Sequence, residues 1–118
     1  MLLKISARTA GCADGYSIVL GSLGELYQPD VAGNYNQVCT DANGFPIFKH
    51  ESNDLYLYNS EIPNFGRYWF VATKINGSPT FFGTHSGCPE TAPAWFVKSG
   101  AGVNDWSKVD DEFTISIL

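Results

Sequence analysis

Residues 33–73 constrain the fold of this chain more than any other stretch, because aromatic-rich strand patterns alternate there with strong turn signals. The dipeptide Asn43-Gly44 is typical of a type I′ hairpin turn, since both of its positions require a residue that accepts positive φ. Pro46 then suits the first position of the returning strand, where a missing N–H group is tolerated. The order of these signals predicts a series of short antiparallel strands.

The same alternation of apolar and polar positions continues on both sides of that stretch. In residues 16–20 the apolar side chains recur at every second position, which is the period of a strand. Residues 55–58 place leucines on one face and tyrosines on the other. Residues 67–75 are apolar on both faces, which predicts a central strand covered on both sides. Residues 76–77, Asn-Gly, predict another hairpin, and residues 83–93 have no periodicity and predict a surface loop.

These patterns predict the class of fold. A chain of 118 residues suits a single hydrophobic core. No stretch sustains helical periodicity, although one or two helical turns are compatible with Trp106–Asp111. We therefore predict one compact antiparallel all-β domain over residues 1–118, sandwich- or barrel-like, with about seven to nine short strands and little helix. The side chains expected to point inward are those of Tyr35, Phe48, Trp69, Phe70, Trp95, Phe113, Ile115 and Ile117.

The charge of the chain limits the classes of partner that it can bind. The formal net charge is −5 at pH 7, and the Lys and Arg residues are scattered along the sequence rather than clustered. Binding to a phosphate backbone or to an anionic membrane surface needs clustered cations. No apolar run approaches the roughly 18 residues that span a bilayer. We expect neither a nucleic-acid partner nor membrane insertion.

Three cysteines, Cys12, Cys39 and Cys88, leave an odd count. In a secreted protein this favours one intrachain disulfide and one free or intermolecular thiol, and the sequence leaves all the pairings open. The alternative is a cytosolic protein with reduced, buried cysteines. The first residues, MLLKISARTAG, hold too short an apolar segment for a secretory signal. Either the sequence begins at the mature chain or the protein is not exported by that route. Of these alternatives we favour a secreted protein.

One ordered series of residues carries a family resemblance: Gly33, Tyr35, Asn43, Gly44, Pro46, Phe48, Leu57, Tyr58, Trp69, Cys88, Pro89, Trp95, Trp106 and Asp110. This order resembles a small all-β module that occurs in tandem in invertebrate and protist extracellular proteins, and it covers residues 33–118. The resemblance implies a β-fold and an extracellular setting but no particular activity. The module would have a cysteine after its last strand to pair with Cys88. This chain has none there, which leaves Cys12 or Cys39 as the partner.

Catalytic and metal-binding patterns are weak in this sequence. His85 and Cys88 lie close together, but a thiol nucleophile also needs a group that orients its base. Two histidines and three dispersed cysteines do not make a zinc site. Asp41-x-Asn43 and the acidic run 110–112 offer oxygen ligands for calcium without its full ligand series, so a turn and a solvated acidic patch are the simpler interpretations. We expect no cofactor, no bound metal and no enzyme activity.

Aromatic side chains beside amides and carboxylates give the candidate ligand site. An aromatic ring can stack on the C–H face of a sugar while amide and carboxylate groups bind its hydroxyls. Two segments have this composition, one around the tyrosines of residues 55–58 and one around Trp106. The alternative is that these rings pack in a second sheet face or in a subunit contact. The predicted ligand-binding residues are Asn53, Asp54, Tyr56, Tyr58, Asn104, Asp105 and Trp106.

We therefore predict a secreted, non-catalytic lectin of invertebrate type whose partners are glycans, either mono- or oligosaccharides. A shallow single site binds sugar weakly, so a homo-oligomer is expected to supply avidity. The alternative function is a protein-interaction or self-assembly module, which would expose a large apolar patch. A small hydrolase that uses a pair of loop carboxylates is the third hypothesis.

Overall fold

The computed structural model describes residues 12–84, 87–100, 102, 105–109 and 112–118. In chain order the elements are β1 (Gly15–Val19), α2 (Ser22–Tyr27), η2 (Pro29–Val31), β2 (Gly33–Thr40), β3 (Pro46–His50), β4 (Tyr56–Ile62), β5 (Gly66–Ala72), β6 (Pro79–Thr84), η3 (Pro89–Thr91), β7 (Trp95–Lys98), β8 (Trp106–Lys108) and β9 (Thr114–Ile117). Within the described residues the nine strands form a single sheet in the order β8-β7-β6-β5-β4-β3-β2-β1-β9. All the pairings are antiparallel, which confirms the predicted fold class.

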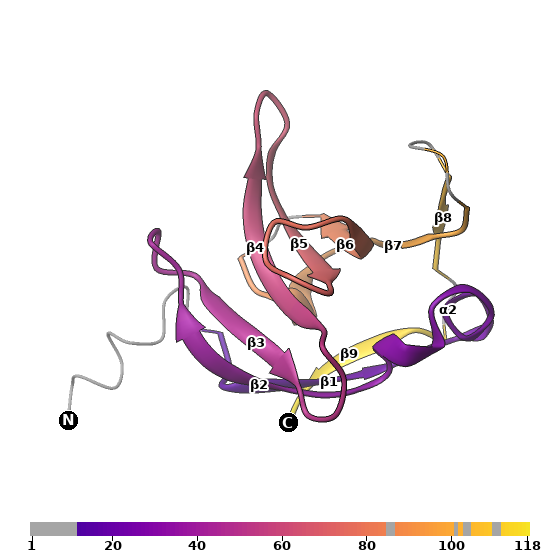
Figure 1. The fold of residues 1–118 in the computed structure, drawn as a ribbon, viewed down its shortest axis with the longest axis horizontal. Coiled ribbons are helices and arrows are strands. Elements are labelled where there is room, and N and C mark those ends of the chain that lie inside the picture. Colours follow the sequence, from indigo (N-terminus) through magenta and orange to yellow (C-terminus); the bar gives the residue numbers. More distant parts are fainter. Residues whose placement is uncertain (1–11, 85–86, 101, 103–104, 110–111) are drawn as a thin grey trace.

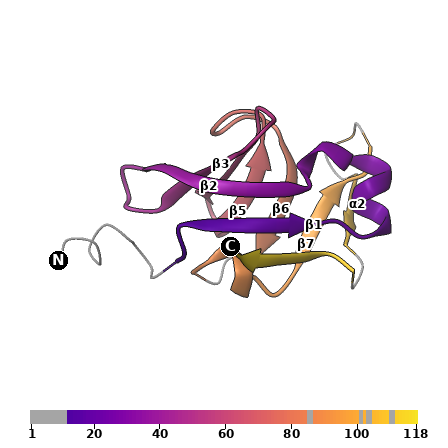
Figure 2. The same cartoon turned by 90° about the horizontal axis from the view of Figure 1, so that it is seen from below.

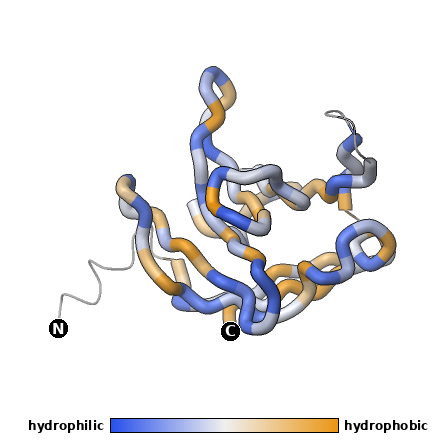
Figure 3. Tube along the Cα trace, viewed as in Figure 1, coloured by the Kyte–Doolittle hydropathy of each residue, from blue (hydrophilic) through white to orange (hydrophobic). Residues whose placement is uncertain are grey.

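The sheet curls into a half-barrel, so its two ends face each other across the core (Figures 1 and 2). β1, β2 and β9 run along one side, and β5, β6 and β7 cross on the other. The main core lies on the concave face between these two sides. Its largest fully buried side chains are Trp69, Tyr16, Tyr35, Phe48 and Phe81. In Figure 3 the turn between β3 and β4 is hydrophilic, whereas hydrophobic residues follow the strands.

β5 is covered on both faces, as its sequence predicts. Trp69 and Val71 enter the main core, whereas Phe70 packs on the convex face of the sheet with Ile47 and Tyr58. The prediction that Phe70 shares the inward face with Trp69 is therefore wrong, because neighbouring residues of a strand point to opposite faces. A second layer of aromatic side chains thus covers the outside of β4, β5 and β6.

A disulfide joins the start of the described chain to η3. It links Cys12 to Cys88 across a sequence separation of 76 residues, and Cys39 is a free, exposed thiol. Next to the disulfide, the Tyr16 hydroxyl donates a hydrogen bond of 2.7 Å to the Glu90 carboxylate. The pattern of one disulfide and one free thiol agrees with the prediction from the odd cysteine count.

The β2–β3 hairpin is confirmed, but its turn type differs from the prediction. Gly44 has a φ of 88°, whereas Asn43 is not among the residues with positive φ, so the turn is not type I′. The Asp41 side chain fixes the conformation of this turn, because its Oδ1 accepts hydrogen bonds from the backbone N–H groups of Asn43 and Phe45 at 2.8 and 2.9 Å. An aspartate at the start of a turn favours this Asx arrangement.

Replacing Asp41 by alanine is expected to lower the free energy of unfolding by about 1–2 kcal/mol, because two backbone N–H groups lose a charged acceptor. Urea unfolding measures the change. The matched control is Asp54→Ala, which removes a carboxylate that is 93% exposed and lies 3.8 Å from Lys49 Nζ. The control substitution should lower the free energy of unfolding by less than about 0.5 kcal/mol. Equal effects of the two substitutions would contradict the role given to Asp41.

Three further predictions about the elements need correction. The α-helix lies at Ser22–Tyr27 rather than in the segment Trp106–Asp111. That segment contains β8 instead, and its residues 110–111 lie outside the described residues. Gly83 and Thr84, expected in a loop, belong to β6. Phe113 and Ile115 pack against the main core, but Ile117 is 57% exposed because β9 is an edge strand. Among the described residues, no helix is long and apolar enough to cross a membrane.

Candidate functional site

A cleft opens where the β2–β3 and β4–β5 hairpins diverge. β3 and β4 are paired only at Phe48↔Leu57 and Lys49↔Tyr56, whereas β4 and β5 stay paired from Tyr56↔Ala72 to Ile62↔Gly66. The β4–β5 hairpin therefore rises away from β3 and leaves a wedge between the two hairpins (Figure 1). We call this wedge the hairpin cleft. Its volume is about 360 Å³, and it is lined by Asp41, Ala42, Asn43, Ile47, Tyr58, Asn59, Ser60, Glu61, Arg67, Ile75 and Asn76.

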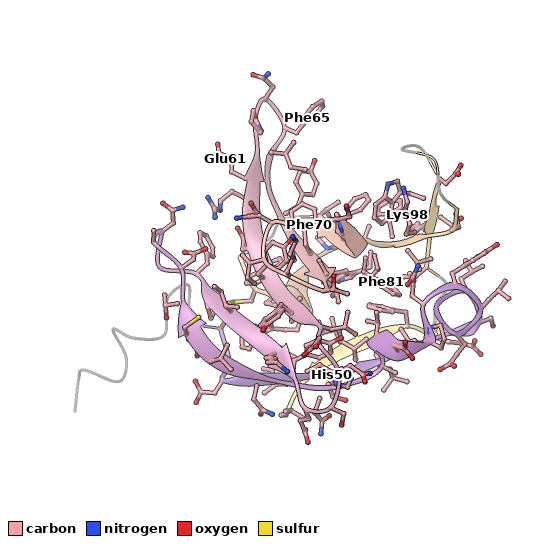
Figure 4. All side chains as sticks on the ribbon, viewed as in Figure 1. His50, Glu61, Phe65, Phe70, Phe81 and Lys98 are labelled. Atoms are coloured by element: carbon pink, nitrogen blue, oxygen red, sulfur yellow. A yellow bond between two sulfur atoms is a disulfide. The ribbon has the colours of Figure 1, made fainter. Side chains whose placement is uncertain are left out.

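The polar side chains of the hairpin cleft come from four separate segments. The β2–β3 turn supplies Asp41 and Asn43, β4 supplies Asn59 to Glu61, β5 supplies Arg67, and the β5–β6 loop supplies Asn76. Figure 4 shows Glu61 on the side of the β4–β5 hairpin that faces the β2–β3 hairpin. A hydrogen bond of 3.1 Å from the Ser60 hydroxyl to Asn76 Oδ1 holds the β5–β6 loop against β4.

Asn59 and Arg67 form the most unusual contact of the hairpin cleft. Asn59 is only 4% exposed, and its Oδ1 accepts a hydrogen bond of 2.6 Å from Arg67 Nε. Its Nδ2 is buried and has no hydrogen-bond partner among the described residues. A buried amide donor without a partner costs about 1–3 kcal/mol and is rare in folded proteins, so the Asn59–Arg67 contact is a candidate functional feature.

The guanidinium of Arg67 is held in place by an aromatic ring. Its Cζ lies 4.3 Å from the centre of the Phe45 ring, and Phe45 in turn packs edge-on against Trp69 at 6.2 Å. Stacking on a ring leaves the edge of the guanidinium plane free to donate hydrogen bonds. Because Nε is already bound to Asn59, the N–H groups on the two Nη atoms remain available to a ligand in the cleft.

Apolar side chains form the remaining wall of the cleft. Ile47 and Tyr58 come from the convex face of the sheet, and Ile75 comes from the β5–β6 loop. Burial raises the pKa of the Tyr58 hydroxyl, and a hydrogen bond with the Asn76 backbone partly offsets this shift. Tyr58 therefore remains a neutral phenol at physiological pH.

The predicted residues of the β3–β4 turn lie outside the hairpin cleft. The amide of Asn53 donates to the Asp30 carbonyl at 3.0 Å, and the carboxylate of Asp54 lies near Lys49. The buried ring of His50 organises this turn, because its Nδ1 accepts hydrogen bonds from the backbone N–H groups of Ser52 and Asn53. These contacts give Asn53 a role within the fold.

The two predicted tyrosines share the convex face of β4 but differ in exposure. Tyr56 is partly exposed, with Lys49 Nζ 5.9 Å from the centre of its ring. Tyr58 is only 2% exposed and packs against Phe70. Tyr58 nevertheless lines the hairpin cleft as part of its apolar wall, so its predicted role in ligand binding stays a prediction.

The second predicted segment lies several strands away, at the β8 end of the sheet. Asn104 is outside the described residues. Asp105 Oδ2 accepts a hydrogen bond of 2.8 Å from the Gly102 backbone, so this carboxylate shapes its own loop. Trp106 is half-buried on β8, where it packs on Phe82 and lies under Lys98 Nζ. Because β5, β6 and β7 separate β4 from β8, the two predicted segments do not form one site.

Trp106 instead belongs to an apolar groove on the convex face. The groove has a volume of about 280 Å³ and is lined by Ile62, Phe65, Tyr68, Phe70, Pro79, Phe82 and Trp106. Phe65 is 73% exposed at the tip of the β4–β5 hairpin (Figure 4). The lining of the groove offers few polar atoms, so the groove suits an apolar contact better than a sugar.

Among the described residues, the side chains that could bind a metal ion are dispersed. In the described part of the chain, no three His, Cys, Asp or Glu side chains gather into a group that could hold a metal ion. Asp41, one candidate calcium ligand, has one carboxylate oxygen engaged by the turn. Of the other acids considered for calcium, Asp110 and Asp111 lie outside the described residues, and Glu112 accepts a hydrogen bond from Ser22.

Comparison with protein-family models, with curated proteins and with solved structures found no match for this chain. The function therefore has to be argued from the cleft itself.

Proposed function

We propose that this protein is a secreted, non-catalytic carbohydrate-binding protein whose ligand occupies the hairpin cleft. The observation that supports this most is the Asn59–Arg67 pair, in which the buried Asn59 amide oxygen orients a guanidinium whose free edge has no partner within the described residues. Sugar hydroxyls are satisfied by amides, guanidinium groups and carboxylates of this kind. This proposal keeps the predicted function but moves its site to a cleft that contains Tyr58 and none of the other predicted residues.

The size and composition of the cleft also favour a sugar. A volume of about 360 Å³ lies within the usual range for a small-ligand site. Its lining combines amide, hydroxyl and charged groups with the apolar side chains of Ile47, Tyr58 and Ile75. The apolar groups can contact the C–H faces of a sugar ring while the polar groups bind its hydroxyls.

The disulfide supports the proposal of secretion. A protein with a bond between Cys12 and Cys88 fits an oxidising compartment outside the cytosol. A single open cleft would bind a monosaccharide weakly, so we also propose that several copies act together on a multivalent glycan.

A glycan array with and without EDTA tests the function, and substitutions test the site. Asn59→Leu and Arg67→Lys are each expected to weaken binding roughly 10- to 100-fold, because the first removes the acceptor that orients Arg67 and the second removes donors to the ligand. The matched controls are Tyr56→Ala and Trp106→Ala, which alter partly exposed aromatic side chains outside the cleft. The controls should bind as the unaltered protein does. A blank array at high protein concentration would exclude glycan binding.

A second function, protein contact through the apolar groove, has one specific observation in its favour. Phe65 is exposed beside a groove whose other walls are largely aromatic. A single Phe65→Ser substitution would abolish such contacts and leave glycan binding unchanged. Hydrolysis is the third hypothesis, and it predicts release of reducing sugar that Glu61→Gln would eliminate. Unchanged glycan after prolonged incubation would support binding without catalysis.

A further inference from the structure

We infer that the hairpin cleft selects neutral sugars with adjacent hydroxyl groups and discriminates against sugars that carry a carboxylate. This inference rests on the proposed function and specifies its ligand class. The reasons lie in the positions of the donors and acceptors in the cleft and in their charges.

Donors and acceptors are side by side at the mouth of the cleft. Glu61 and Arg67 are directly opposite each other in the β4–β5 register. They do not form an ion pair with each other or with another described residue, although directly opposed side chains of a strand pair are near neighbours. Arg67 is held instead by Asn59 and Phe45. The cleft therefore presents a donor from Arg67 next to an acceptor from Glu61.

A pair of adjacent hydroxyls matches this arrangement. Each hydroxyl both donates and accepts a hydrogen bond, so one can accept from Arg67 while its neighbour donates to Glu61. A carboxylate only accepts. A uronide keeps its ring hydroxyls, so what distinguishes it is its carboxylate, which could accept from Arg67 but would lie close to the like charge of Glu61.

The charge of the lining reinforces this selection. Arg67 is the cation among the lining residues, whereas Asp41 and Glu61 are both carboxylates, so the lining has a negative net charge. The whole chain is also negative, with a formal net charge of −5. The field of the protein therefore opposes the approach of an anionic sugar, and this opposition weakens as salt is added.

Matched pairs of sugars test the inference directly. Methyl glucoside and methyl glucuronide differ only in that the hydroxymethyl group of the first is a carboxylate in the second, and methyl galactoside and methyl galacturonide differ in the same way. Titration of the intact protein with each sugar, followed by amide chemical shifts, measures the dissociation constant and locates the site. At least one neutral sugar should bind at least tenfold more tightly than its matched uronide, with shifts at Asn59, Ser60 and Arg67.

Glu61→Gln identifies the source of the discrimination. This variant keeps the size of the side chain and an acceptor oxygen but removes the negative charge, so it should reduce the preference for the neutral sugar at least threefold. Asp54→Asn is the control, because it removes a charge from the β3–β4 turn outside the cleft, and it should leave the preference unchanged. Added salt should improve binding of the uronide and leave binding of the neutral sugar unchanged.

The possible failures are distinguishable. Equal or tighter binding of the uronides at the same amides would overturn the inference and leave glycan binding in place. Neutral-sugar shifts confined to residues outside the cleft would overturn the assigned site. No shifts with any of the four sugars, together with a blank glycan array, would overturn the proposed function as well.

Discussion

Replacing Cys12 and Cys88 together by alanine is expected to lower the free energy of unfolding by about 4 kcal/mol. The disulfide closes a long loop, since its cysteines are 76 positions apart in the sequence, and a cross-link of that span restricts the unfolded chain strongly. Cys12 is also fully buried in the main core, next to the Tyr16–Glu90 hydrogen bond. Urea unfolding of the oxidised protein and of the variant measures the difference.

Cys39→Ser provides the matched control for this prediction. Cys39 is a free, exposed thiol, so its substitution should change the free energy of unfolding by less than about 0.5 kcal/mol. Since folded domains are stable by only about 5–15 kcal/mol, loss of the disulfide would remove a large share of the total. A loss of less than about 1 kcal/mol would mean that the fold does not depend on oxidation, and the argument for an oxidising compartment would then fail.

The strands and hairpins were predictable because their signals are local. Alternation at residues 55–58 places Leu57 in the main core and Tyr56 on the convex face, as observed. Pro46 begins β3, as its missing N–H group suggests. The type of the β2–β3 turn was not predictable from Asn43-Gly44 alone, because the Asp41 side chain competes for the backbone N–H groups of the turn.

The helix was missed because it has almost no signal of its own. Ser22–Tyr27 is a six-residue helix with Gly21 at its N-cap and Gly24 inside it. Glycine is a poor helix former, and so short a helix depends on tertiary packing rather than on propensity. A Cβ at Gly24 would lie 2.9 Å from Leu20 Cδ2, so close packing against Leu20 requires the glycine there.

The candidate site was missed for a different reason. The sequence analysis searched for aromatic and polar residues that are neighbours along the chain, whereas Asn59 and Arg67 are brought together across the β4–β5 hairpin. The cleft itself exists because β3 and β4 diverge, and no local pattern encodes that divergence. One signal was present: Leu55 and Leu57 point inward, so the same alternation places the polar Asn59 inward as well. A polar residue at an inward position is informative.

Gly83→Ala is expected to lower the free energy of unfolding by about 3 kcal/mol, at the upper end of the cost of overpacking. Gly83 in β6 lies opposite Trp95 in β7, and the indole covers the glycine. A Cβ on Gly83 would lie 2.5 Å from Trp95 Cε2 and 2.7 Å from Cδ2. The indole cannot move aside easily, because it is buried and packs against Phe113.

A double-mutant cycle separates this collision from any backbone effect. In a Trp95→Leu background, which removes the indole, Gly83→Ala should cost less than about 1 kcal/mol, so the two substitutions couple strongly. Gly66→Ala is the control: its φ of +97° makes alanine strained, but no atom lies within 4 Å of the added Cβ. That strain should cost about 1–3 kcal/mol in either background.

The cycle tests the curl of the sheet between β6 and β7. The indole of Trp95 lies over β6 and contacts Phe113, which leads into β9, so it links the two ends of the half-barrel. If Gly83→Ala costs the same with and without the indole, Trp95 does not lie over β6. The sheet would then be less curled near β7 than described here. If the costs differ as expected, the absence of a side chain at residue 83 is what lets the sheet close over its core.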